Sequence, residues 1–220
     1  MEVSIDTKVK DIYPQVRLGC MRFEAEVKEP DEAFWKYMDE EVLPEVRKRI
    51  EGVSWSEMPG VRGSRRAYQA LGRNPGRYRV SSEALLRRVR RGDKLYHINS
   101  VVDVNNLLSV TSGLSVGSYD LAKIQGNAVL RKGEAGEGYA GIGKDFLEME
   151  NMLVLADDDG IFGSSMSDGR RTMVTEQTRS VLVVMYCFED EIDLDVLLEE
   201  GRKAFARYAG ADDIRTWIVK

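Results

Sequence analysis

The sequence predicts an α+β fold, because its strand and helix signals are grouped along the chain and do not alternate regularly. Strand-like segments come first, one long and two short helices follow, and the second half is rich in strands with one late helix. The length of 220 residues and the hydrophobic share of 43% suit a single domain over residues 1–220. We expect two closely packed halves without a flexible linker, since the sequence has no low-complexity stretch or internal repeat.

Three signals define the elements of the first half. Strand-like alternation near the N-terminus changes phase between Cys20 and Phe23, which suggests a bulge. Asp31 is a potential helix N-cap, and Pro44 is expected to kink or split the helix that follows. The expected elements are strands within residues 1–10 and 15–28 and helices at 31–50, 67–71 and 81–91.

The most informative segment of the second half is an apolar, strand-like run at residues 98–120. It contains Asn99, Asp103 and Asn106, and a buried polar group without a partner costs roughly 1 to 3 kcal/mol. These side chains are therefore expected either to satisfy one another or to face a pocket. The elements expected after it are a helical turn at 120–124, strands at 129–131, 154–156, 161–162, 181–188 and 216–219, and a helix from 193 or 194 to 208.

The composition disfavours several classes of protein. No apolar run approaches the roughly 20 residues of a membrane span, and the N-terminus lacks the apolar core of a secretory signal, so a cytoplasmic location is expected. Cys20 and Cys187 suit reduced core thiols, and a single histidine, His97, disfavours a zinc site. Asp157–Asp159 is interpreted as an acidic turn, with a hard-cation site as the alternative. The glycine-rich segment from Gly133 lacks the strand-to-helix context and the downstream acid of a dinucleotide site, so we predict no cofactor. The single histidine and the acidic turn lead us to predict no metal.

The net charge of −5 conceals a basic segment, in which ten arginines between Arg62 and Arg91 face one acid, Glu83. Such a cluster can neutralise phosphates and give salt-dependent binding to a nucleic acid. It can equally form a solvated helix face with arginine–carboxylate pairs to the rest of the protein. Both interpretations stay open. The candidate nucleic-acid contacts are Arg65, Arg66, Arg73, Arg77, Arg87, Arg88 and Arg91.

A polar loop at Gly163–Thr172, GSSMSDGRRT, offers hydroxyls, guanidinium groups and backbone N–H groups. This chemistry suits an anion or a carboxylate-bearing ligand, and a tight turn pinned by arginines would have the same sequence. Arg170 and Arg171 would point to opposite faces of a strand, so at most one of them could enter a pocket. A serine triad is disfavoured, because His97 is the only possible base and the nucleophile-elbow pattern is absent.

Three motifs occur in order along most of the chain: GRNPGRYRVSSEALLRRV, INSVVDVNNLLSVTSGLSVGSYDL and DGRRTMVTEQTRSVLVV. With them the sequence resembles the B3/B4 module, the tRNA-editing domain of the bacterial phenylalanyl-tRNA synthetase beta subunit, which also occurs as free-standing proteins. The resemblance implies a three-layer α/β arrangement around an unusual β-sandwich, with flanking helices and the editing pocket between its two halves. The activity it implies is hydrolysis of the ester that links a wrong amino acid, tyrosine, to phenylalanine-specific tRNA.

The resemblance also assigns individual positions. Asn106 matches an asparagine that lines the family's pocket, and Asp103 and Asp120 match acids of two family motifs. Ser164 and Ser165 match the small residues that close around the amino acid. The pocket residues expected from the motifs and the polar loop together are Asn99, Asp103, Asn106, Gly117, Ser164, Ser165, Asp168 and Arg170.

Two positions depart from the family pattern. Gly117 stands where the family has a pocket histidine, and Val184 stands where it has the glutamate that recognises the tyrosine hydroxyl. An apolar valine cannot satisfy a hydroxyl, so discrimination of tyrosine by the family's means is not expected. No residue is assigned as catalytic.

The leading hypothesis from the sequence is a trans-acting aminoacyl-tRNA deacylase, whose arginine-rich segment contacts tRNA. Asn106 and backbone groups would position water, the terminal adenosine hydroxyl would assist, and loop N–H groups would stabilise the oxyanion. This requires that the regions of Asn106 and Ser164 share a hollow large enough for an aminoacyl adenosine. The alternatives are a non-catalytic module that binds tRNA or an amino-acid-like molecule, and a small-molecule enzyme that reuses the pocket.

Overall fold

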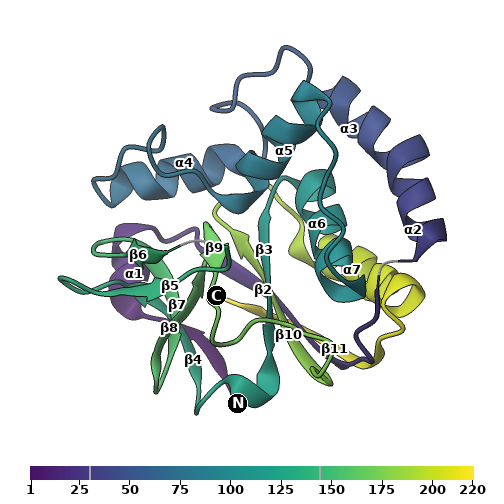
Figure 1. The fold of residues 1–220 in the computed structure, drawn as a ribbon. Helices are drawn as coiled ribbons and strands as arrows, with labels where there is room; N and C mark the ends of the chain where they lie inside the picture. The colour runs from purple at the N-terminus through teal and green to yellow at the C-terminus, as the bar shows by residue number, and fades with distance from the viewer. Residues whose placement is uncertain (30, 144) are drawn as a thin grey trace.

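Figure 1 shows three layers in the computed structural model, which describes residues 1–29, 31–143 and 145–220. One sheet forms an outer layer, a second sheet the middle layer, and helices the other outer layer. The strands are β1 (Val3–Ile5), β2 (Arg17–Glu24), β3 (Ser115–Asp120), β4 (Ala128–Lys132), β5 (Gly138–Ala140), β6 (Phe146–Glu148), β7 (Leu153–Asp157), β8 (Gly160–Ser164), β9 (Ser167–Asp168), β10 (Ser180–Cys187) and β11 (Asp212–Val219). The helices are α1 (Thr7–Ile12), α2 (Glu32–Tyr37), the π-helical turn η1 (Met38–Val42), α3 (Leu43–Ile50), α4 (Val61–Ala70), α5 (Ser81–Arg91), α6 (Ser100–Ser112), the 3₁₀ turn η2 (Leu121–Lys123) and α7 (Leu194–Tyr208).

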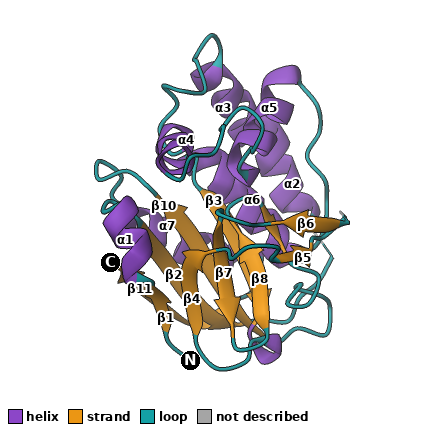
Figure 2. Cartoon of the chain, turned by 90° about the vertical axis from the view of Figure 1, so that its left-hand side faces the viewer, coloured by secondary structure: helices purple, strands orange, loops and turns teal. Residues whose placement is uncertain are grey.

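The outer sheet has the order β1-β4-β7-β8-β9, with β1 parallel to β4 and the other neighbours antiparallel. The middle sheet has the order β11-β2-β10-β3 and is antiparallel. β5 and β6 form a separate ribbon, and α3, α4 and α5 gather beyond one end of the strands (Figure 2). This mixed α/β architecture confirms the predicted fold class.

The middle sheet is buried on both faces, because its central strands carry apolar side chains at consecutive positions. In β10, Leu182 and Val184 belong to the core between the two sheets, whereas Val183 and Met185 belong to the core beneath the helices. Successive side chains of a strand point to opposite faces, so an uninterrupted apolar run fits a strand that separates two cores.

Two predictions near the N-terminus were wrong, and the first is explained by the same burial on both faces. The change of phase after Cys20 is no bulge in β2, which pairs with β10 in unbroken register. Cys20 faces the core between the sheets, and Met21 and Phe23 face the helical core. The strand expected within residues 1–10 was also wrong beyond β1, since Asp6 accepts from the Lys8 N–H at 2.8 Å and starts α1.

The strand-like prediction for residues 98–120 was wrong for its first part, which forms helix α6. Asn99 is the N-cap and accepts from the N–H groups of Val101 and Val102, and Gly113 ends the helix with a φ of 79°. Because α6 is buried nearly all round, its sequence lacks the apolar stripe of a surface helix, and its valines favour a strand locally. Only β3 remains a strand in this segment.

Most other elements agree with the sequence expectations. The helix after Asp31 is interrupted by the π-helical turn η1, and Pro44 lies directly after this turn, at the start of α3. Asp193 caps α7 through the N–H groups of Asp195 and Val196, and Gly92 ends α5 in the left-handed conformation. Within the described ranges, no helix combines the length and apolar character needed to cross a bilayer.

Candidate functional site

A cavity of about 110 Å³ lies where α5, α6, β3 and the β8–β9 turn meet. Three of the residues predicted for the pocket line it together, namely Asn106 from α6, Ser164 from β8 and Asp168 from β9. The chain thus brings the Asn106 and Ser164 regions to one hollow, which meets the first of the two conditions of the hypothesis, a shared hollow. The volume is far below the roughly 300 to 1,000 Å³ of pockets for drug-sized ligands, so the expectation of a hollow for a whole aminoacyl adenosine was wrong. The cavity has room for an amino-acid side chain. The other lining residues are Ser81, Leu85, Val102, Asn105, Ser109, Val116 and Ser167.

Helix α6 supplies one wall because its residues at helical spacing face the same side. Val102, Asn106 and Ser109 follow one another at intervals of four and three, and Asn105 lies one turn before Ser109. The Asn105 amide donates from Nδ2 to the Val116 carbonyl at 2.6 Å, which attaches α6 to β3. The Asn106 side chain has no hydrogen-bond partner among the described residues and is half-buried, so its amide can bind a ligand.

The β8–β9 turn supplies the opposite wall, and its serines are largely engaged within the protein. Ser164 Oγ accepts from the N–H groups of Met166 and Ser167 at 3.2 and 3.4 Å and bonds the Tyr139 hydroxyl at 2.9 Å. Ser165 is buried outside the cavity, with its Oγ 2.8 Å from the Tyr68 hydroxyl. The loop N–H groups expected to stabilise an oxyanion therefore already have a partner in Ser164.

Asp168 is the titratable side chain of the cavity. Its carboxylate accepts hydrogen bonds from the Tyr119 hydroxyl and the Ser118 N–H, and Tyr119 in turn lies 2.9 Å from the Tyr186 hydroxyl. Burial raises the pKa of the Asp168 carboxyl to about 7, and the Tyr119 hydrogen bond opposes that rise only in part. The group can therefore gain or lose a proton near neutral pH, which suits proton transfer or the binding of an ammonium group.

Gly117 and Val184 lie directly opposite each other on β3 and β10, on the face that points toward the outer sheet. A Cβ atom at Gly117 would overlap the Tyr119 hydroxyl and come within 2.7 Å of Asp168 Oδ1. Tyr119 and Asp168 thus occupy the space in front of Gly117, where the resemblance places the side chain of the family's histidine. Gly117 itself does not line the cavity.

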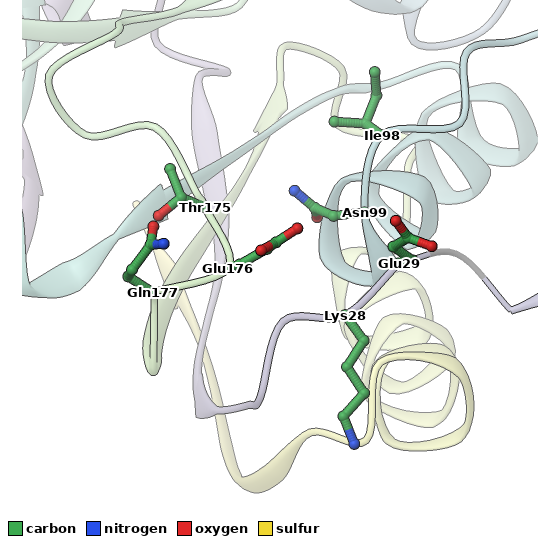
Figure 3. A pocket seen from close by; sticks show the side chains of 7 residues that line it. All are labelled: Lys28, Glu29, Ile98, Asn99, Thr175, Glu176 and Gln177. Atoms are coloured by element: carbon green, nitrogen blue, oxygen red, sulfur yellow. The ribbon is translucent and has the colours of Figure 1, made fainter.

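Asn99 lines a different, open hollow of about 330 Å³ between the start of α6 and residues 175–177. Figure 3 shows its side chain and that of Glu176 pointing toward one another across this hollow. Since Asn99 Oδ1 caps α6, its role in the structure is to start the helix. Arg170 is exposed and donates from Nε to the Gly141 carbonyl at 3.0 Å, outside the cavity.

The two acids assigned by the resemblance serve local structure. Asp103 accepts from the Trp35 indole N–H and the Ile98 N–H, both at 3.0 Å, and burial raises the pKa of its carboxyl. Asp120 caps η2 and accepts from the Thr178 hydroxyl at 2.9 Å. Neither acid lines the cavity.

His97 is exposed and stacks on Trp35 at 3.7 Å between ring centroids, away from the serines of the cavity. Among the described residues no cluster of three or more histidine, cysteine or acidic side chains could hold a metal ion.

The arginine segment divides between structural pairs and exposed side chains. Buried Glu83 receives Arg65 at 2.9 Å and Arg87 at 2.8 Å, which joins α4 to α5. Arg66 and Arg77 are exposed and form no ion pair with another described residue, so they suit phosphate contact. The other arginines predicted to contact nucleic acid bond groups of the same chain. Arg73 donates to the Glu150 carbonyl, Arg88 donates to the Lys94 carbonyl, and Arg91 pairs with Asp93.

We predict that Glu83→Gln lowers the free energy of unfolding by about 2 kcal/mol, because it leaves two partly buried guanidinium groups without a counter-charge. Urea denaturation followed by circular dichroism measures this loss. The matched control is Asp93→Asn, which breaks an exposed pair with Arg91 and should cost no more than about 0.5 kcal/mol. Equal losses in the two variants would contradict the prediction.

Comparison with known proteins identifies the family of this domain. The family model of the B3/4 domain matches residues 63–194, which include α5, α6, β3, the β8–β9 turn and the whole cavity. The chain therefore belongs to the B3/4 domain family. The match is to the domain and defines no reaction.

Individual relatives match a shorter segment. Beta subunits of phenylalanine–tRNA ligase are 34% identical over 88 residues in Cutibacterium acnes, 32% over 97 residues in Chromobacterium violaceum and 28% over 88 residues in Wolbachia sp. subsp. Brugia malayi. These segments cover 39–41% of this chain and only 10–12% of the relatives. An N-terminal fragment of the phenylalanyl-tRNA synthetase beta subunit from Pyrococcus horikoshii superposes with a TM-score of 0.46 and 14% identity, over 99% of this chain and 50% of the fragment.

The sequence did not identify Asn105, Ser109 and Tyr119 as residues of the site. Asn105 and Ser109 share a wall with Asn106 only because residues 100–112 are helical, and a strand would have placed Asn105 and Asn106 on opposite faces. The spacing of four residues between Asn105 and Ser109 is the signal that could have found them. Tyr119 carries no sequence signal for its contact with Asp168, which β9 brings across from the outer sheet.

Proposed function

We propose that this protein hydrolyses the ester between an amino acid and tRNA, acting in trans as an aminoacyl-tRNA deacylase. The observation that carries the proposal is the convergence of Asn106, Ser164 and Asp168 on one small cavity within a B3/4 domain. The same family module occurs in tRNA ligase beta subunits, and the cavity has the size of an amino-acid side chain. A cytoplasmic setting, where charged tRNA is present, belongs to this proposal.

The chemistry of ester hydrolysis requires an oriented water molecule and stabilisation of the oxyanion. Asn106 has a side-chain amide without a partner among the described residues, so it can donate to the developing oxyanion or hold the water. Asp168 can accept the proton of that water, because its carboxyl titrates near neutral pH beside the cavity. Arg66 and Arg77 are the arginines that we assign to tRNA phosphates, since their side chains are exposed and unpaired with described acids.

The non-catalytic module is the second candidate, and one observation favours it. The resemblance assigns a histidine and a glutamate to an editing pocket. In this chain Gly117 and Val184 stand at those two positions, opposite each other on β3 and β10. A protein that has kept the pocket and lost hydrolysis would still retain tRNA in a salt-dependent manner.

Asn106→Ala is predicted to reduce the rate of deacylation about 100-fold, because it removes a polar group that acts on the reacting ester. The assay follows release of radiolabelled amino acid from a panel of misacylated tRNAs, with Asn74→Ala as the control, since Asn74 is exposed and outside the cavity. No release by the wild-type protein from any charged tRNA, together with salt-dependent tRNA retention, would replace the deacylase with the binding module.

A further inference from the structure

Two buried polar atoms of α6 are left without hydrogen bonds at the cavity. Asn105 and Ser109 both line it and are only 5% and 1% exposed. Asn105 Oδ1 and Ser109 Oγ have no partner among the described residues. A buried polar atom without a partner costs roughly 1 to 3 kcal/mol, so this pair requires a group that supplies hydrogen bonds.

The orientation of both groups follows from their surroundings. Asn105 donates from Nδ2 to the Val116 carbonyl, so its Oδ1 is the free end of the amide and can only accept. Ser112 and Thr111 on the same helix donate back to the carbonyls of Leu108 and Leu107 at 2.6 and 2.9 Å, as hydroxyls within helices commonly do. Ser109 Oγ makes no such bond and can donate or accept toward the cavity.

The volume and the remaining lining restrict the ligand further. A cavity of about 110 Å³ has room for roughly three or four water molecules, and a dry cavity that binds benzene has about 150 Å³. The volume therefore favours a small side chain over an aromatic ring. Leu85, Val102 and Val116 supply apolar surface beside the polar atoms, which suits a side chain that carries a methyl or methylene group next to its polar atom.

We infer that this cavity selects a small hydroxyl-bearing amino acid, serine or threonine, whose hydroxyl donates to Asn105 Oδ1 and bonds Ser109 Oγ. The inference rests on the proposed function, because it names the substrate of the same site. Valine has nearly the shape of threonine but no hydroxyl, so it would leave both α6 atoms unpaired. A site built to bond a hydroxyl rejects such an analogue far more strongly than an apolar pocket distinguishes two shapes.

The test compares release of the amino acid from tRNAs charged with threonine, valine, serine, alanine and tyrosine. The threonyl ester should be hydrolysed at least about tenfold faster than the valyl ester, and the seryl ester faster than the alanyl ester. The tyrosyl ester should not be hydrolysed. Ser109→Ala should bring the ratio of threonine to valine toward one. Ser112→Ala removes a hydroxyl of the same helix that lies outside the cavity, so it should leave the ratio unchanged.

A second measurement separates the inference from the proposed function. Calorimetry with adenosine that carries threonine or valine through a stable 3′-amide reports binding without hydrolysis. If no ester is cleaved, the deacylase proposal fails, and a tighter fit of the threonyl compound would still support the inference. Equal affinities, equal rates for threonine and valine, preference for tyrosine, or absence of binding to both compounds would each overturn it.

Discussion

Replacement of Asp168 by asparagine is expected to stabilise the protein at pH 8 and to flatten the pH dependence of its stability. In the native state the carboxyl is held beside the cavity, between Tyr119 and the Ser118 N–H, and burial raises its pKa to about 7. In the unfolded chain the same group has a pKa near 3.8. The native state therefore binds this proton more tightly than the unfolded state does.

The sign of the effect follows from proton linkage. Below about pH 4 the carboxyl is protonated in both states and its contribution to stability is complete; between about pH 4 and 7 that contribution is lost as the pH rises. Above pH 7 the native protein contains a buried charge. The interval between the two pKa values corresponds to a loss of at most roughly 4 kcal/mol, which Asp168→Asn should remove.

Urea titrations of the wild type and Asp168→Asn at pH 4.5, 6 and 8 measure this difference. The two proteins should be closest in stability at pH 4.5 and diverge as the pH rises. Asp11→Asn is the matched control, because Asp11 is exposed and its substitution should leave the pH profile unchanged. A wild type whose stability rises steadily from pH 4.5 to 8, in parallel with Asp168→Asn, would show that Asp168 is ionised throughout.

The elements that the sequence predicts well are those with local start and stop signals. Asp193 caps α7 and Gly92 ends α5, and both helices have an exposed side that makes their period visible. Helix α6 has such signals at Asn99 and Gly113, yet burial on nearly all sides removes the polar stripe. Its tertiary contacts override the local preference of its valines for a strand.

The site could be predicted from the sequence only in part, for the same reason. Asn106 was expected at a pocket because it interrupts an apolar run, and Ser164 and Asp168 because they lie in a polar loop; these three do meet. Asn99 has the same composition signal but is a helix cap. The partners of Asp168 come from strands of the other sheet, so no local pattern along the chain could indicate them.

Gly117→Ala is expected to destabilise the protein by about 3 kcal/mol and to disrupt the carboxyl of the cavity. The added methyl group would overlap the Tyr119 hydroxyl and approach Asp168 Oδ1 to 2.7 Å, and the ring of Tyr119 is fully buried against Phe162 and cannot move outward. Gly72→Ala is the control, because a Cβ there meets nothing within 4 Å and its φ of 73° limits the cost to about 1 kcal/mol.

A double-mutant cycle with Tyr119→Phe assigns this cost to the hydroxyl. Phenylalanine removes the oxygen that the new methyl group overlaps, so Gly117→Ala should cost less in the Tyr119→Phe background than in the wild type, by about 1 kcal/mol or more. The free energies of unfolding of the four proteins measure the coupling. If the two substitutions were additive, the hydroxyl of Tyr119 would not occupy the space in front of Gly117, and the arrangement of Asp168, Tyr119 and Tyr186 described here would be wrong.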